Sequence, residues 1–278
     1  MDADAELMTS SVRRGSGVRE AVSHSNAFEW LARAGFLARG AIYGIIGILA
    51  LKIALGSGGK TTNQQGALET IAHRPFGKVL LVLAAIGLAG YSLWRLARAA
   101  LARGREDSDG TFDRIAALGS GVIYGTLCAI AVEILLGYGG SGNAQRAASG
   151  VLGWPGGPWV VGIAGVALLG VGLYQAYRGF TTDFLADSKT EQMTSWVRRW
   201  ISFIGTFGHL ARAVVFGLVG VFLVKAAIEY DPNKAVGIDG ALAKLARQSY
   251  GSFLLGLVAA GLIAFALYSI SDARFRRI

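Results

Sequence analysis

The stretch 40-GAIYGIIGILALK-52 indicates the kind of protein that this chain forms. Its first twelve residues, Gly40 to Leu51, carry no charge, and Lys52 then ends the run. The stretch belongs to an apolar block that we place at residues 36–56, and about twenty apolar residues cross a hydrocarbon core about 30 Å thick. The block therefore predicts a transmembrane helix with a lysine near one end.

Five further blocks of similar character follow, and the composition of the whole chain agrees with them. The 278 residues are 53% hydrophobic and only 16% charged, whereas about a quarter of the residues in a soluble domain are charged. The blocks are too long and too uniformly apolar for barrel strands. We predict an all-α integral membrane protein with six transmembrane helices, at residues 36–56, 79–100, 117–138, 159–180, 203–228 and 252–271.

Lysine and arginine predict the orientation of these helices. Sixteen of them fall on the side that carries both termini, seven fall on the other side, and four fall within the spans. The six tryptophans lie at predicted span ends, where aromatic residues concentrate. We therefore expect both termini in the cytoplasm, with residues 1–27 as a flexible cytoplasmic tail.

The chain also contains three copies of one sequence repeat. GAIYG at Gly40, GVIYG at Gly121 and AVVFG at Ala213 lie in matched odd-numbered spans, and GLAGYSLWR, GVGLYQAYR and GLIAFALYS lie in the spans that follow. The repeats predict three helical hairpins within one membrane domain, at residues 28–105, 106–186 and 187–278. Because each hairpin has two spans, all three share one orientation and imply a pseudo-threefold axis along the membrane normal.

Small residues recur four apart in each odd-numbered span and predict close helix packing. In the third copy Ala213 takes the place of the first glycine. The glycines that we assign to helix packing are Gly40, Gly44, Gly121, Gly125 and Gly217.

An ionisable residue lies eight positions after the second small residue of each odd-numbered span. These residues are Lys52, Glu133 and Lys225, and ionisable residues within spans are candidates for function. Two interpretations stay open. The three side chains converge near the pseudo-axis as an intramembrane charge cluster that binds a solute or ion, or they form a structural ion pair or reach the headgroups from the span ends.

A second matched position holds Arg39, Ser120 and Arg212. We predict that the two arginines and His209 lie at the inner interface, where arginine contacts anionic lipid. His209 lies just before Arg212 and is a candidate proton relay or haem ligand. No second histidine lies in a span, which disfavours haem held by two histidines.

Other motifs that signal chemistry are incomplete in this sequence. GSGGKT, from Gly56 to Thr61, lacks the first glycine of a phosphate-binding loop, because Ala54 takes its place. Cys128 is the single cysteine, so no disulfide framework or cysteine-based metal cluster forms within the chain. We predict no catalytic residues, no metal site, no cofactor and no nucleic-acid partner; the charge of +9 lies mostly at span ends.

The three hairpins, the outer GALxxLA segment and the C-terminal string YSISDARFRRI resemble a bacterial membrane family, domain of unknown function 1206. The resemblance covers roughly residues 28–278. It implies a six-helix protein of the bacterial inner membrane and no particular activity.

Two classes of function remain open from the sequence. The first is an interaction or scaffolding component of the membrane, with the lipid bilayer and a further membrane protein as partners. The second is a transporter or channel for a small solute or ion, with its site at Lys52, Glu133 and Lys225 on the pseudo-axis. The direction in which these three side chains point separates the two.

Overall fold

The computed structural model describes residues 26–101, 111–138 and 144–276, and these residues are almost entirely helical. The predicted flexible tail at residues 1–27 lies outside the described part up to residue 25. Six helices are long and apolar enough to cross a membrane. They are α2 (Asn26–Ala54), α4 (Gly77–Leu101), α5 (Thr111–Leu135), α7 (Gly157–Thr181), α8 (Ser195–Ile228) and α10 (Gly251–Phe275).

The six predicted spans are thus present, but two of them begin much earlier than the sequence indicates. Helix α2 begins at Asn26 and α8 at Ser195, whereas the apolar blocks suggest residues 36 and 203. Polar and charged residues continue both helices beyond the apolar block, and Thr194 caps α8 by accepting from the Val197 amide at 3.4 Å. Arg39 and Arg212 therefore lie near the middle of their helices.

Each repeat has a short helix between its two long ones. These short helices are α3 (Gln64–Ala72), α6 (Ala144–Leu152) and α9 (Ile238–Ala246), and single 3₁₀ turns η1 (Asp183–Leu185), η2 (Thr190–Gln192) and η3 (Pro232–Lys234) lie in the connections. A glycine starts the next long helix in every copy. A methyl group at Gly77, Gly157 or Gly251 would lie 1.9–2.3 Å from a carbonyl oxygen of the preceding short helix, so the tight return requires glycine.

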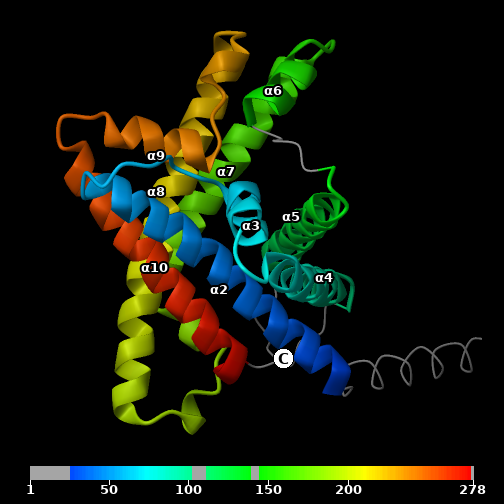
Figure 1. The fold of residues 1–278 in the computed structure, drawn as a ribbon, viewed down its shortest axis with the longest axis vertical. Helices are drawn as coiled ribbons and strands as arrows, with labels where there is room; N and C mark the ends of the chain where they lie inside the picture. The colour runs from blue at the N-terminus through cyan, green and yellow to red at the C-terminus, as the bar shows by residue number, and fades with distance from the viewer. Residues whose placement is uncertain (1–25, 102–110, 139–143, 277–278) are drawn as a thin grey trace, which may run out of the picture.

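The repeats join into a ring through three equivalent helix pairs. The second long helix of one repeat packs along the first long helix of the next, which gives the pairs α4–α5, α7–α8 and α10–α2. Figure 1 shows these pairs running in three different directions. The all-helical fold of three two-helix repeats is the predicted one.

Small residues lie at all three of these pairs and let the backbones approach closely. A methyl group at Gly40 would lie 3.0 Å from the Ala266 carbonyl oxygen, and one at Gly125 would lie 3.1 Å from the Ser92 hydroxyl. The remaining members of the predicted set contact the same faces: Gly44 lies opposite Ala266, Gly121 opposite Leu96, and Gly217 opposite Gly172.

The middle repeat differs from the other two in how its own long helices meet. Helices α2 and α4 pack together in the first repeat, as do α8 and α10 in the third, but α5 and α7 are not among the well-packed pairs of the described chain. We call the space between α5 and α7 the seam.

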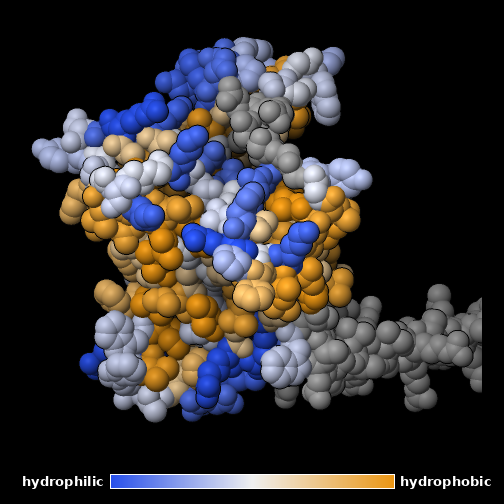
Figure 2. Space-filling model, viewed as in Figure 1, coloured by the Kyte–Doolittle hydropathy of each residue, from blue (hydrophilic) through white to orange (hydrophobic). Residues whose placement is uncertain are grey.

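The surface agrees with a membrane environment. Figure 2 shows an apolar belt between more polar ends. Many large apolar side chains are exposed on the long helices, among them Leu83, Ile163 and Leu173 at 59%, 67% and 74%. Exposed apolar area on this scale marks a surface that contacts lipid or protein. We call the end of the bundle with the start of α2 and the end of α10 the terminal side, and the end with α3, α6 and α9 the opposite side.

A buried arginine network as the candidate functional site

A buried arginine near the middle of α2 joins the first and third repeats. Arg39 of α2 is only 5% exposed. Its Nη2 donates to Asp272 Oδ2 at 2.8 Å, its Nε to Ser269 Oγ at 3.0 Å, and its Nη1 to Tyr91 Oη at 2.9 Å. Helix α10 supplies two of these acceptors and helix α4 supplies the third, so the guanidinium is hydrogen-bonded through all three of its nitrogens.

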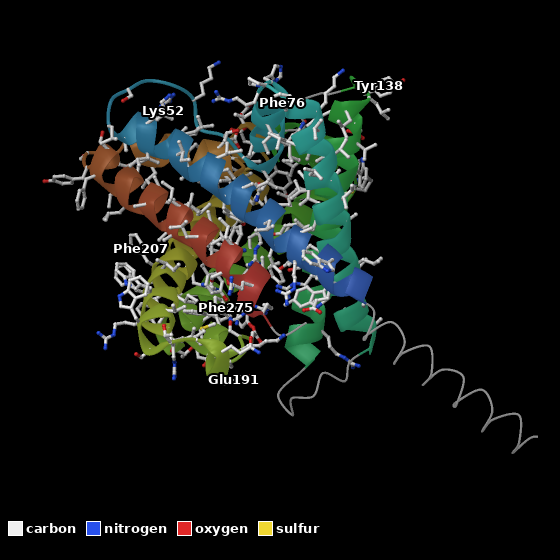
Figure 3. The ribbon with its side chains drawn as sticks, turned by 60° about the horizontal axis from the view of Figure 1, so that its bottom comes forward. Lys52, Phe76, Tyr138, Glu191, Phe207 and Phe275 are labelled. Atoms are coloured by element: carbon white, nitrogen blue, oxygen red, sulfur yellow. The ribbon has the colours of Figure 1, made fainter. Side chains whose placement is uncertain are left out.

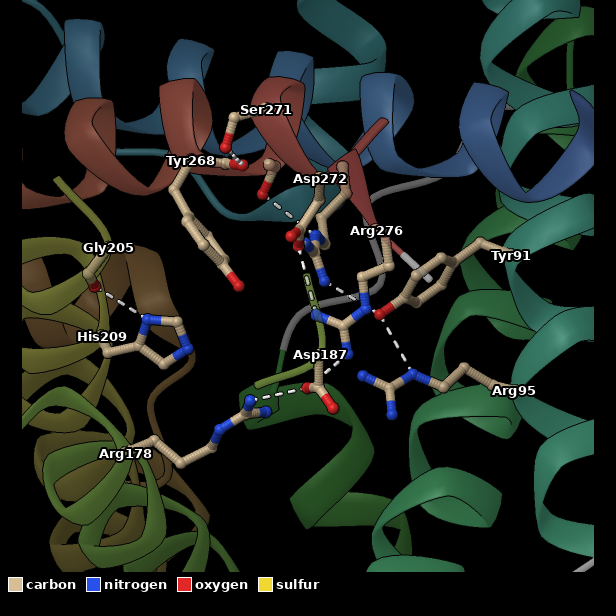
Figure 4. A network of polar contacts seen from close by, with 12 residues as sticks. Tyr91, Arg95, Arg178, Asp187, Gly205, His209, Tyr268, Ser271, Asp272 and Arg276 are labelled. Carbon is tan, nitrogen blue, oxygen red and sulfur yellow. Dashed lines mark hydrogen bonds and ion pairs between the residues drawn. The ribbon is translucent and has the colours of Figure 1, made fainter. Parts of the chain in front are cut away.

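The ion pairs continue from Asp272 into the second repeat. Arg276 Nη1 lies 3.5 Å from Asp272 Oδ2, and Arg276 Nη2 donates to Asp187 Oδ2 at 2.7 Å. Asp187 also accepts from Arg178 Nη2 at 2.7 Å. Much of this chain of charges is visible in Figure 4. It links α2, α10, the connection between α7 and α8, and α7, so side chains from all three repeats meet in one network.

Backbone contacts join the same two segments, the connection between α7 and α8 and the end of α10. The Lys189 amide donates to the Phe275 carbonyl at 2.7 Å, and Ser188 forms an isolated bridge with Arg276. Burial by itself would lower the pKa of Arg276, but the carboxylates of Asp187 and Asp272 raise it overall. Arg276 therefore stays charged although it is 4% exposed.

Aromatic rings enclose the cations of this network. The Arg39 guanidinium lies 5.0–5.3 Å from the ring centres of Phe36, Tyr91 and Phe265. Such ring faces attract a cation, and the attraction is stronger where water is excluded. The charges of the network are thus paired with one another, while Asp272 Oδ1, Arg276 Nε and the nearby Tyr268 hydroxyl are buried without a hydrogen-bond partner among the described residues.

Arg212, the repeat equivalent of Arg39, has a different environment. Its guanidinium lies 4.3 Å from the Phe265 ring centre and about as close to two further rings, those of Tyr43 and Phe216. With the Gln175 amide oriented to face it, the amide oxygen accepts from Arg212 Nη1 at 2.7 Å. Among the residues that the structure describes, no carboxylate lies within 4.0 Å of Arg212. An arginine at the centre of a transmembrane helix costs about 2.5–3.5 kcal/mol on insertion scales.

Arg39 and His209 do not lie at the inner interface, where the sequence places them. His209 is 3% exposed, donates from Nδ1 to the Gly205 carbonyl at 2.8 Å and stacks on Phe184 at 4.8 Å. Both helices begin so far before these residues that their side chains lie in the bundle interior. Arg212 is half-buried in the same interior.

The structure does not bring Lys52, Glu133 and Lys225 together. All three side chains are exposed, and Lys225 Nζ lies 3.9 Å from Glu229, the residue that follows the end of α8. Figure 3 shows Lys52 on the same side as Phe76 and Tyr138, away from Glu191 and Phe275. Eight residues advance a helix by about 80° beyond two full turns, so these positions turn away from the face that carries the packing glycines.

A cavity of about 530 Å³ opens on the opposite side between α3, α4 and α5. Glu69, His73 and Lys78 line it together with apolar residues, but none of the three matched charges does. The cavity therefore does not serve the predicted charge cluster.

These features define a class: a multi-pass α-helical membrane protein built from three two-helix repeats and tied together by a buried ion network. The chain belongs to the family described as Domain of Unknown Function (DUF1206), whose model matches residues 34–102, 115–182 and 207–276. The three matches coincide with the three repeats, so the resemblance noted from the sequence is confirmed.

One relative extends over nearly the whole chain. An uncharacterized protein named YxxB, from Bacillus subtilis strain 168, is 33% identical over 249 residues, which cover 88% of this chain and 90% of the relative. No solved structure matches the chain. Family and relative indicate no specific activity.

Sequence reasoning missed most of the network. Asp272 lies one residue beyond the predicted end of the last span, so we did not count it as an intramembrane charge. Tyr91 and Gln175 lie in matched second-helix motifs, but neither is ionised. An aspartate that follows directly on an apolar block, in YSISDARF, was the signal available in the sequence.

Proposed function

We propose that the protein is an interaction or scaffolding component of its membrane and is not an enzyme or a transporter. The observation that supports this proposal is where the charged side chains lie. The repeat-matched Lys52, Glu133 and Lys225 face outward, while the buried network around Arg39 is paired within the protein.

A transport site needs polar groups that converge on a path through the bundle. Inward-facing charges mark such paths. Here Asp187 and Asp272 are already bound to arginines from neighbouring elements, and Arg212, which has no carboxylate partner among the described residues, is bound to Gln175. Interaction through the exposed helix faces uses the surface that the fold leaves available. Transport is therefore not favoured.

The proposal includes location and orientation. The excess of lysine and arginine on the terminal side supports cytoplasmic termini, since these residues are retained in the cytoplasm. The Bacillus relative supports a bacterial plasma membrane. We assign no cofactor and no catalytic residue, because the buried polar groups serve to join helices.

Proteoliposomes test the proposal directly. Purified protein is reconstituted and the fluxes of protons, Na⁺, K⁺ and Cl⁻ are compared with those of empty vesicles. We expect no difference, and we expect chemical cross-linking in native membranes to recover the protein in a complex larger than one chain. A flux that Glu133→Gln abolishes would overturn the proposal.

A further inference from the structure

The seam between α5 and α7 is a real departure from the symmetry of the other repeats. A methyl group at Gly87 would lie 2.7 Å from the Ala34 carbonyl oxygen, and one at Gly261 would lie 2.3 Å from the Ala211 Cβ. These glycines therefore touch the first long helix of their own repeats. Gly170 is the matched glycine of the middle repeat, and a methyl group there meets nothing within 4 Å.

The exposed fractions of matched aromatic residues also show that the middle repeat differs from the other two. Trp94 and Tyr268 are 6% and 2% exposed, whereas Tyr177 at the same repeat position is 56% exposed. On α5, a methyl group at Gly119 also meets nothing within 4 Å. The faces that close the other two hairpins are thus not covered by described residues in the middle one.

Arg212 lies next to this seam. It bonds to Gln175 of α7, one of the two helices that border the seam. Helices α2, α8 and α10 contribute the rings around it. In Figure 1, α5 lies beside α4 while α7 lies beside α8, away from α5.

The depth of Arg212 restricts what can reach it. Arg212 follows Trp200 by 12 residues and precedes Lys225 by 13, which places it about 18 Å and about 20 Å along α8 from these two residues. The guanidinium is therefore near the middle of the span, whereas lipid headgroups lie at its ends. A transmembrane helix, in contrast, brings side chains to every depth.

We propose that the seam binds a transmembrane helix of another protein, whose mid-span aspartate or glutamate pairs with Arg212. The inference rests on the proposed interaction role and names the class of partner. A carboxylate supplies the counter-charge that Arg212 lacks, and in the apolar interior such a pair is bidentate and oriented. The partner helix covers the apolar faces of α5 and α7.

A second copy of this chain does not fit that role. Of its eighteen acidic residues, Glu133 and Asp272 are the two within the membrane-capable spans of the described helices, because Glu29 and Asp113 precede the spans of α2 and α5, which begin at Ala32 and Arg114. Glu133 lies two residues before the end of α5, and Asp272 is 1% exposed and bound to Arg39. Neither can present a carboxylate at mid-span to another molecule.

A synthetic helix tests the proposal with the full-length protein. The probe has about twenty leucine and alanine residues with one central glutamate, and a matched probe carries glutamine instead. Labelled protein and labelled probe are combined in phosphatidylcholine vesicles, and energy transfer gives the affinity. We expect the glutamate probe to bind at least about tenfold more tightly than the glutamine probe.

Variants of the protein locate the binding. Arg212→Gln removes the preference for glutamate, and Arg212→Lys retains part of it. Gly170→Phe fills the seam and weakens both probes, whereas Leu83→Phe adds the same ring on the exposed face of α4 and changes neither. Thermal unfolding checks that each variant folds; if Arg212→Gln does not, the lysine and phenylalanine variants carry the test.

Three results would overturn the proposal. They are equal binding of the two probes, binding that Arg212→Gln leaves unchanged, and Arg212-dependent binding of phosphatidylglycerol that excludes the probe. If the probe fails while the protein is still recovered in a complex, only this inference falls. Solute flux in proteoliposomes would instead contradict the proposed function.

Discussion

The Arg39 guanidinium donates to the Asp272 carboxylate at 2.8 Å across 233 residues of chain, and so ties the first repeat to the last. Asp272 in turn lies 3.5 Å from Arg276, which bonds to Asp187 in the connection to the third repeat. The first and third repeats are therefore joined by charge as well as by the packing of α10 on α2.

Replacing Asp272 with asparagine should destabilise the protein strongly. Removing one partner of a buried ion pair costs about 3–5 kcal/mol, because the other charge stays buried without compensation. The unfolding free energy in detergent measures this loss. The control is Glu229→Gln, which removes partly exposed ion pairs with Lys225 and Lys234 and should change stability by at most about 1 kcal/mol. Equal effects of the two variants would contradict the structural role of the network.

Two matched glycines should respond in opposite ways to alanine. Gly87→Ala places a methyl group 2.7 Å from the Ala34 carbonyl oxygen, and overpacking of this kind costs about 1–3 kcal/mol. Gly170→Ala meets nothing within 4 Å and gains helix propensity, so the protein should be unchanged or about 1 kcal/mol more stable. Unfolding midpoints of both variants compare them, and a large loss at Gly170 would show that the seam is closed.

The double swap Lys52→Glu with Glu133→Lys should show no coupling. Both side chains are exposed and turn away from the packing faces, so a double-mutant cycle should give an interaction energy within about 0.5 kcal/mol of zero. A swap that rescues two destabilised single variants would restore the hypothesis that these charges converge.

Glu29 provides a test at acid pH. Its hydrogen bond to Arg33 holds the pKa of this carboxyl below its ordinary value of 4.5. A lowered folded-state pKa means that the contribution to stability is present above pH 4.5 and is lost as pH falls through the folded-state pKa. Arg33 also donates to the carbonyls of Ala273 and Arg274, so this pair helps to hold α2 against the end of α10.

The measurement for Glu29 is an NMR titration of its side-chain carboxyl. Arg33→Gln should return the pKa toward 4.5, while Arg198→Gln, an exposed change at the start of α8, should leave it alone. An unchanged titration in Arg33→Gln would contradict the assigned cause.

Cysteine labelling tests the proposed orientation. In a Cys128→Ser background, Lys60→Cys should react with a membrane-impermeant maleimide in intact cells, because it lies on the opposite side. Arg198→Cys, on the terminal side, should react only after the membrane is permeabilised. The reverse pattern would invert the topology.

Much of the fold was predictable from local pattern. Apolar blocks such as that around Gly40 are long enough to span a membrane, and a hydrocarbon core admits only helices or closed barrels. The repeats follow from short matched strings and were confirmed by the family matches. The helix starts were not predictable to the same degree, because α2 and α8 continue through polar residues outside the apolar block.

The candidate site was only partly predictable. The sequence marked Arg39 and Arg212 as equivalent, but not that Arg39 pairs with Asp272 whereas Arg212, among the described residues, bonds to Gln175 and to no carboxylate. Pairing depends on which helix faces lie opposite each other, and a linear pattern does not contain that information. For the same reason, the shared repeat position of Lys52, Glu133 and Lys225 did not reveal that their side chains lie apart in the structure.

The sequence by itself determined the membrane class, the six helices and the threefold repeat, because length and hydrophobicity act locally along the chain. Only the tertiary structure decided that Arg39 is neutralised, that Arg212 is not, and that the middle repeat stays open beside it. These outcomes depend on contacts between residues far apart in sequence, such as Gly87 with Ala34 and their absent counterpart at Gly170.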